Sequence, residues 1–159
     1  MLIVSDASPL IALAACDKLN VLNELFDRVC IPQAVFDELA VPNKPFAENI
    51  ITWTKDKVVP AQNRTAITAL SLSLDPGESE AISLYWEISA DFLLIDEKRG
   101  RTIAHRNGIQ TIGTVGVLLF AKQQGLIPSV KPLLQTLTHN GFRISDVLYQ
   151  QILKRAEEE

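Results

Sequence analysis

The sequence contains few of the residues that build disulfides, soft-metal sites or nucleophilic triads. It has two cysteines, Cys16 and Cys30, and two histidines, His105 and His139, among 159 residues. The cysteines lie in apolar segments without metal-ligand spacing, which predicts buried thiols in a reducing cytosol. No histidine or cysteine falls in the pattern of a nucleophile triad. Both histidines are therefore expected at the surface.

Basic residues and long apolar runs are also scarce. Lysine and arginine number 15 against 19 aspartates and glutamates, which gives a net charge of −4. This balance argues against a general basic nucleic-acid binder, but it allows a nuclease whose acidic pocket holds metal ions. No apolar stretch is long enough to span a membrane, and Met1 leads directly into a predicted strand without a signal peptide. We expect a cytoplasmic protein with no membrane partner.

Short apolar runs alternate with stretches of helical periodicity, and the length suits one domain. This alternation, without repeats or low-complexity tracts, predicts an α/β fold with a mainly parallel sheet. Predicted strands cover 2–5, 29–31, 50–54, 91–96 and 109–112. Predicted helices cover 9–16, 19–26, 33–39, 65–74, 78–88, 99–106, 113–124, 130–137 and 145–156.

Aspartates end two of the predicted strands. Asp6 lies between the strand 2–5 and a helix that Ser8 is expected to cap, with Pro9 in its first turn. Asp96 follows the buried run 92–95 in the same way. Because parallel strands end at one edge of a sheet, where α/β proteins bind ligands, the two carboxylates are expected to converge. The alternative for Asp6 is that it only caps the helix.

Two glutamates lie on helices that would begin near the same edge. Glu38 follows the second strand, and Glu78 opens the helix that leads to the Asp96 strand. Carboxylates brought together repel one another unless a cation lies among them, and oxygen ligands select Mg²⁺ or Mn²⁺. Such ions activate water for attack on a phosphodiester. The alternative for Glu78 is a favourable interaction with the helix dipole.

The chain resembles PIN-domain proteins, especially a VapC-like branch of toxin–antitoxin ribonucleases. The resemblance runs from Met1 to about Leu126, which leaves residues 128–159 as a helical extension of a single domain, 1–159. The matching segments are IVSDASPLIALA, IPQAVFDEL, LDPGESEAISL, ADFLLIDEKRGRTIAHRNGI and TIGTVGVLLFAKQQGLI. The resemblance implies a three-layer α/β/α fold and a metal-dependent nuclease with a cluster of acids.

The resemblance also implies roles for individual residues. Asp6 matches the first acid, Glu38 the second and Asp96 the acid after the last catalytic strand. The third acid is Glu78 or Glu80; the two lie about 200° apart around a helix, so only one can face the pocket well. Spacing to the Asp96 strand favours Glu78.

Several neighbouring residues have possible supporting roles. Ser8 matches a hydroxyl residue that holds a metal-bound water in the family. Glu97 is either an outer contributor to the site or a carboxylate at a helix start. The basic residues that follow are either a solvated helix face or contacts to the RNA backbone: Lys98, Arg99, Arg101 and Arg106. Gly113 and Gly116 lack the lysine of a phosphate loop and are expected to allow close helix–sheet packing.

Three functions compete. The first is a Mg²⁺- or Mn²⁺-dependent endoribonuclease that acts as the toxin of a toxin–antitoxin pair, with RNA as substrate and a cognate antitoxin as partner. The second is a catalytically inactive PIN module that binds protein or RNA. The third, a nucleotide-binding or phosphatase-like domain, needs a glycine-rich loop after strand one, and the chain has none there. A homodimer is also expected, through Leu10, Leu13 and Phe26, unless these residues are core.

Overall fold

The fold is built on five short parallel strands, seen in a computed structural model that describes residues 1–159. The strands are β1 (Leu2–Ser5), β2 (Arg28–Pro32), β3 (Val58–Val59), β4 (Phe92–Leu94) and β5 (Thr111–Ile112). They lie in the order β3-β2-β1-β4-β5, and every neighbouring pair is parallel. The chain therefore builds the sheet outward from β1 in one direction and then, from β4, in the other.

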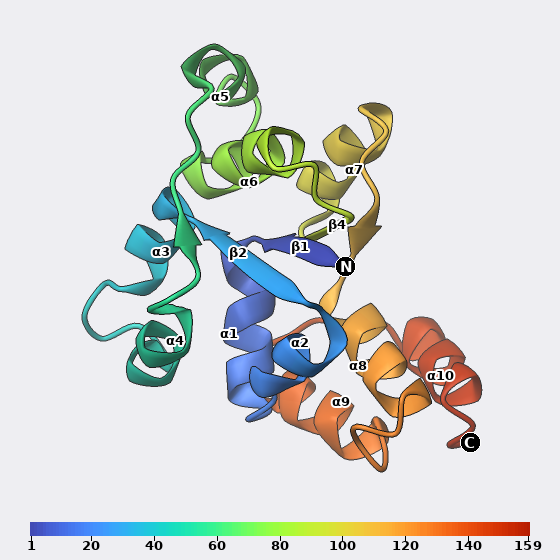
Figure 1. Ribbon diagram of the computed structural model, residues 1–159. Coiled ribbons are helices and arrows are strands. Elements are labelled where there is room, and N and C mark those ends of the chain that lie inside the picture. Colours follow the sequence, from blue (N-terminus) through green and yellow to red (C-terminus); the bar gives the residue numbers. More distant parts are fainter.

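Helices cover both faces of this sheet, so the predicted three-layer α/β/α fold is confirmed. Figure 1 shows α5, α6 and α7 on one side, with α1, α2, α8, α9 and α10 on the other and α3 and α4 beside α1. The N-terminal half contains α1 (Ala7–Ala15), α2 (Asn20–Leu25), α3 (Gln33–Leu39), α4 (Ala47–Thr54) and α5 (Arg64–Leu70). The C-terminal half contains α6 (Pro76–Glu87), α7 (Lys98–Arg106), α8 (Thr114–Gln123), α9 (Lys131–His139) and α10 (Asp146–Arg155).

Side chains that alternate along the central strands divide the core into two clusters. Ile3 faces the larger cluster, together with residues of α1, α2, α8, α9 and α10. Val4 faces the smaller cluster, together with residues of α5, α6 and α7. Both side chains have no exposed surface, as expected for a parallel sheet covered by helices on each face.

Leu10, Leu13 and Phe26 all lie in the larger cluster and are at most 3% exposed. They are core residues, so they offer no surface for a dimer. The Cys16 and Cys30 thiols are free and buried, as predicted. No helix of the structure combines the length and apolar character needed to cross a membrane.

Two local predictions were wrong. The predicted strand 50–54 lies in helix α4, where Ile50 is buried in the larger cluster and Thr54 Oγ1 donates to the Ile50 carbonyl across 2.8 Å. Burial of one helical face thus outweighs the strand preference of its β-branched residues. The edge strand is instead the two-residue β3. In addition, α1 begins at Ala7 with Asp6 in the N-cap position, so Ser8 does not cap it.

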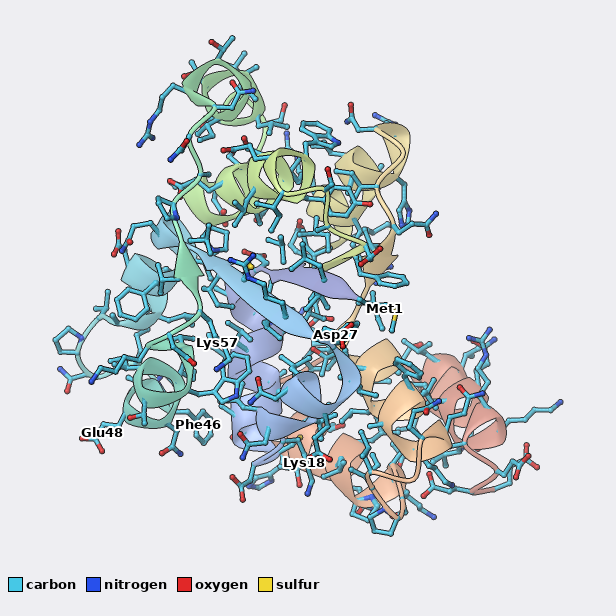
Figure 2. All side chains as sticks on the ribbon, in the orientation of Figure 1. Met1, Lys18, Asp27, Phe46, Glu48 and Lys57 are labelled. Atoms are coloured by element: carbon cyan, nitrogen blue, oxygen red, sulfur yellow. The ribbon has the colours of Figure 1, made fainter.

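The opposite, N-terminal edge of the sheet is tied by a different contact. The amino terminus of Met1 donates a hydrogen bond to Asp27, and the two residues lie next to each other in Figure 2. Asp91 accepts a hydrogen bond from the Leu2 backbone N–H, across 2.6 Å. These contacts fix the start of β1.

Candidate metal and nuclease site

The two strand-ending aspartates meet at the point where the strand order reverses. β1 and β4 are neighbours, with Ser5 opposite Leu94, and the Asp6 backbone N–H donates to the Leu94 carbonyl across 2.9 Å. Asp96 follows Leu94 by two residues. In open α/β sheets the crevice at this reversal is the usual ligand site. The topology therefore brings together two acids that are 90 positions apart in the sequence (96 − 6).

Asp6 is buried without acting as a helix cap. It is only 5% exposed, and its side chain forms no capping hydrogen bond with α1. A buried carboxylate that does not cap the helix needs another explanation, because burial of an ionised group is costly. The alternative that Asp6 serves only as a cap is therefore not supported.

Gly77 lets the start of α6 approach Asp6 and Glu38 closely. A Cβ atom added at Gly77 would lie 3.2 Å from Oε2 of Glu38 and 3.5 Å from Oδ1 of Asp6. Glu38 belongs to α3, which packs against α6. Acids from α3 and from the end of β1 thus flank the same backbone position, as their place in the sequence predicted.

Asp96 is held by the first residue of α8. Thr114 donates its backbone N–H to Oδ1 across 2.7 Å and its hydroxyl to Oδ2 across 2.5 Å. A Cβ atom added at Gly113 would lie 2.9 Å from the same Oδ1, so this glycine permits the contact. Gly116 allows close packing in a similar way, because a Cβ atom added there would lie 2.9 Å from Cγ1 of Ile112. The sequence analysis did not predict Thr114 as a site residue. Its place at the start of a predicted helix was the signal that could have identified it.

Glu78 and Glu80 point to different surroundings. Glu78 is 8% exposed, and its Oε2 lies 3.3 Å from where a Cβ atom of Gly100 would be. Oε1 of Glu80 accepts a hydrogen bond from the Ala34 N–H, across 3.1 Å, in the first turn of α3. Glu80 therefore satisfies an otherwise free N–H group at the start of a helix. Glu78 remains the one of the two that faces the other acids.

One acid near the site was not predicted. Asp75 is the N-cap of α6, and its Oδ1 accepts a hydrogen bond from the Glu78 N–H across 2.8 Å. The sequence Asp-Pro-Gly-Glu suggested only a turn, but an aspartate before a proline in the first helical turn is also a capping signal.

The acids influence one another strongly. Burial, reinforced by the charges of Asp75, Glu38 and Asp96, raises the pKa of Asp6 to about 7, although the nearby Ala7 N–H opposes the shift. Burial, followed by a hydrogen bond and charge from Asp75 and the charge of Asp6, raises the pKa of Glu78 to about 8. These pKa values describe carboxyls that hold protons near neutral pH when no cation balances their charge.

The pKa values of Glu38 and Asp96 are also raised. Burial and then the charge of Asp75 raise the pKa of Glu38, against the pull of Lys44. Burial raises the pKa of Asp96, while the two hydrogen bonds from Thr114 and the charge of Arg101 act to lower it. Lys44 therefore lies near Glu38, and Arg101 lies near Asp96.

The remaining predicted residues lie at the margin of the site. Ser8 is exposed in the first turn of α1. Glu97 is the N-cap of α7, where it accepts a hydrogen bond from the Gly100 N–H across 2.8 Å, so its alternative role at a helix start is supported. The basic residues of α7 are exposed: Lys98, Arg99, Arg101 and Arg106. Of these, Arg101 acts electrostatically on Asp96.

The side chains as they stand do not form a complete ligand set, because no three His, Cys, Asp or Glu residues are close enough to hold a metal ion. The donors nevertheless suit Mg²⁺, which is often bound through one or two carboxylates with water in the remaining positions. Asp6 and Glu38, on either side of Gly77, are the pair that fits this description. Glu78 and Asp96 extend the oxygen donors around them.

Comparison with known proteins identifies the family of the chain. A family model described as a PIN domain matches residues 2–158. No curated protein and no solved structure matches the chain. PIN domains are generally nucleases that use divalent metal ions. Because the family model covers nearly the whole chain, this protein belongs to the PIN-domain family.

Proposed function

We propose that this protein is a Mg²⁺- or Mn²⁺-dependent endoribonuclease and acts as the toxin of a VapC-like toxin–antitoxin pair. The observation that carries the proposal is the position of Asp6, which is only 5% exposed at the reversal of strand order, with Glu38 on the other side of Gly77. A group of acids at such a place is consistent with a bound divalent cation.

Each residue has a role that follows from its position in the site. Asp6 and Glu38 would bind the cation, with Glu78 and Asp96 as further carboxylates at its periphery. When bound, the cation supplies an activated water and neutralises charge on the scissile phosphodiester. Thr114 keeps the two oxygens of Asp96 in a fixed orientation. The exposed hydroxyl of Ser8 is available to a water at the start of α1.

Cationic side chains near the acids would hold the substrate. Arg101 acts electrostatically on Asp96, and Lys44 acts in the same way on Glu38. Lys98 and Arg99 are exposed in the same helix as Arg101. Phosphate contacts of this kind fix the register of a strand without reading its sequence. The net charge of −4 suits binding through a local basic patch rather than through the whole surface.

The test is cleavage of single-stranded RNA by the purified protein with Mn²⁺ or Mg²⁺, compared with the Asp6→Asn variant. Asn has nearly the same shape as Asp but no charge, so cleavage should fall at least about 100-fold with the circular dichroism spectrum unchanged. Equal rates for the two proteins, with contaminating ribonuclease excluded, would reject the assignment. Specific RNA binding without any cleavage would instead support the inactive PIN module.

The proposed partners are a cognate antitoxin and a second copy of the chain. Since Leu10, Leu13 and Phe26 are core residues, a dimer would need other apolar groups. Val147 and Leu148 of α10 are 69% and 43% exposed and are available for such contacts. Light scattering at micromolar concentrations, where a monomer mass would reject the dimer, tests this part separately.

A further inference from the structure

A small, mainly apolar groove runs along one face of α1 and begins beside the acids. Its volume is about 260 Å³, and α1 lines it with residues at helical spacing: Ser8, Ile11, Ala12 and Ala15. Ser8 follows Asp6 by two positions, so one end of the groove adjoins the candidate site. No charged side chain lines the groove. A ligand that extends from the acids into it would therefore place an uncharged part there.

Two phenylalanines from separate segments also line the groove. Phe46 precedes α4 and Phe142 follows α9, and both helices pack against α1. Figure 2 shows Phe46 beside α4, on the side nearer to α1. Phe46 is 36% exposed, so its ring is accessible to a ligand. Aromatic rings that line a groove beside a nucleic-acid backbone stack on bases, and every base has a π face.

The backbone holds Phe46 in a conformation that bulky residues seldom adopt. Its φ and ψ are 61° and 17°, in the left-handed region, and its side chain forms no capping hydrogen bond with α4. Asn43 has a φ of 68° in the same loop, but asparagine tolerates this region better than phenylalanine does. Strain of this kind is concentrated at binding and catalytic sites. Local backbone preference therefore does not explain an aromatic ring at position 46.

The segment that carries Phe46 also passes the acids. It connects α3, which contains Glu38, to α4, and Lys44 within it acts electrostatically on Glu38. Lys44 is suited to a phosphate, and Phe46 to the base attached to it. The Ser8 hydroxyl and the side-chain carbonyl of Asn140, which also line the groove, are available to the polar edge of a base.

We propose that this groove is a base-binding subsite, which holds one nucleobase of single-stranded RNA next to the scissile phosphate, stacked on the ring of Phe46. This inference rests on the RNA substrate of the proposed function. The groove is smaller than the roughly 300–1,000 Å³ of pockets for drug-sized ligands, which limits its occupant to a single base. Stacking of this kind strengthens binding and accepts any of the four bases.

The experiment measures the Kd of the full-length protein for two single strands by fluorescence anisotropy. EDTA is present, so that cation-dependent cleavage does not occur. One strand is a short RNA of random sequence, and the other is the same ribose–phosphate chain without bases. Phe46→Ala removes the ring, and Phe46→Tyr keeps it. Trp86→Ala is the matched control, because Trp86 is a 41% exposed aromatic residue of α6, on the other face of the sheet from α1.

Stacking predicts a loss that is confined to position 46 and to the strand with bases. Phe46→Ala should raise the Kd for RNA about tenfold, whereas Phe46→Tyr and Trp86→Ala should stay within about twofold of the parent. On the chain without bases, Phe46→Ala and the parent should bind with the same Kd. A purely structural role for Phe46 would instead lower the affinity for both strands equally.

The outcomes separate this inference from the proposed function. Equal losses on both strands, no loss in Phe46→Ala, or a parent protein that binds neither strand would overturn the inference. RNA that is bound as expected but never cleaved in Mg²⁺ or Mn²⁺ would reject the nuclease and leave the base-binding groove in place. Cleavage by a parent protein that has the same Kd for both strands would leave the nuclease in place and overturn the inference.

Discussion

Thr114 donates two hydrogen bonds to Asp96, one to each carboxylate oxygen, at 2.7 and 2.5 Å. The backbone N–H and the hydroxyl of one residue thus fix the plane of an acid that follows β4. Hydrogen bonds to a charged group are stronger than those between neutral groups. This pair of hydrogen bonds therefore fixes the orientation of the Asp96 carboxylate at the edge of the sheet.

Replacement of Thr114 tests this orientation. Thr114→Val keeps the shape and the backbone N–H but removes the hydroxyl, so we expect RNA cleavage to fall about tenfold through loss of one charge-assisted hydrogen bond. Cleavage rates at saturating Mn²⁺ provide the measurement. Thr114→Ser retains the hydroxyl and should restore most of the rate. If Val and Ser variants behave alike, the hydroxyl does not position Asp96.

Replacement of Glu78 by glutamine should affect Mn²⁺ binding, whereas the same replacement of Glu80 should affect mainly stability. Glu78→Gln is expected to weaken Mn²⁺ binding about tenfold or more, because a charged ligand becomes neutral. Glu80→Gln should leave Mn²⁺ binding near the parent value and cost about 1 kcal/mol or less in stability, since its amide oxygen still accepts from Ala34. Metal titration and urea unfolding measure the two effects. A larger loss of metal affinity in Glu80→Gln would make Glu80 the third acid.

Stability should fall as the pH rises when no divalent cation is present. The folded-state pKa of Asp6 is raised from 3.8 to about 7 and that of Glu78 from 4.5 to about 8. At a pH between the unfolded and the folded pKa of each group, the folded protein binds more protons than the unfolded chain does. The extra stability is fully present below pH 3.8, decreases as the pH rises, and is lost as the pH passes through about 7 and 8.

Urea unfolding in EDTA from pH 4 to pH 9 checks this prediction. Asp6→Asn should reduce the slope, because one of the titrating carboxyls is gone. Mn²⁺ should also reduce it, since a bound cation replaces the protons. An identical pH dependence in the parent and in Asp6→Asn would mean that Asp6 does not hold a proton in the folded protein.

Gly77→Ala tests the close approach of α6 to the acids. The new Cβ atom would lie 3.2 Å from Oε2 of Glu38 and 3.3 Å from Cγ2 of Val35, so the neighbouring side chains must move. We expect Mn²⁺ affinity to fall about tenfold, with a loss of roughly 1–3 kcal/mol in stability from overpacking. Calorimetry and urea unfolding give the two values. Parent-like Mn²⁺ binding would show that the space at Gly77 is not needed by the site.

The pattern of residues was enough to predict the class of fold and the edge of the sheet at which the acids gather. The run Leu2-Ile3-Val4 is apolar on both faces, which is typical of a covered parallel sheet, and parallel strands place their C-terminal residues together. From that rule alone Asp6 and Asp96 could be predicted at the same edge of the sheet. The motif that contains Glu78 suggested the third acid, and rotation around the helix separated it from Glu80.

Details that depend on contacts between distant segments could not be predicted from local patterns. The β-branched residues of 50–54 form a helix because Ile50 is buried against the larger core cluster, and no local pattern encodes that contact. Thr114 and Asp75 became parts of the site only when α8 and α6 were placed at the sheet edge. Leu10 and Phe26 proved to be core rather than interface for the same reason: burial is a property of the packed chain, and hydrophobicity does not say which neighbour provides it.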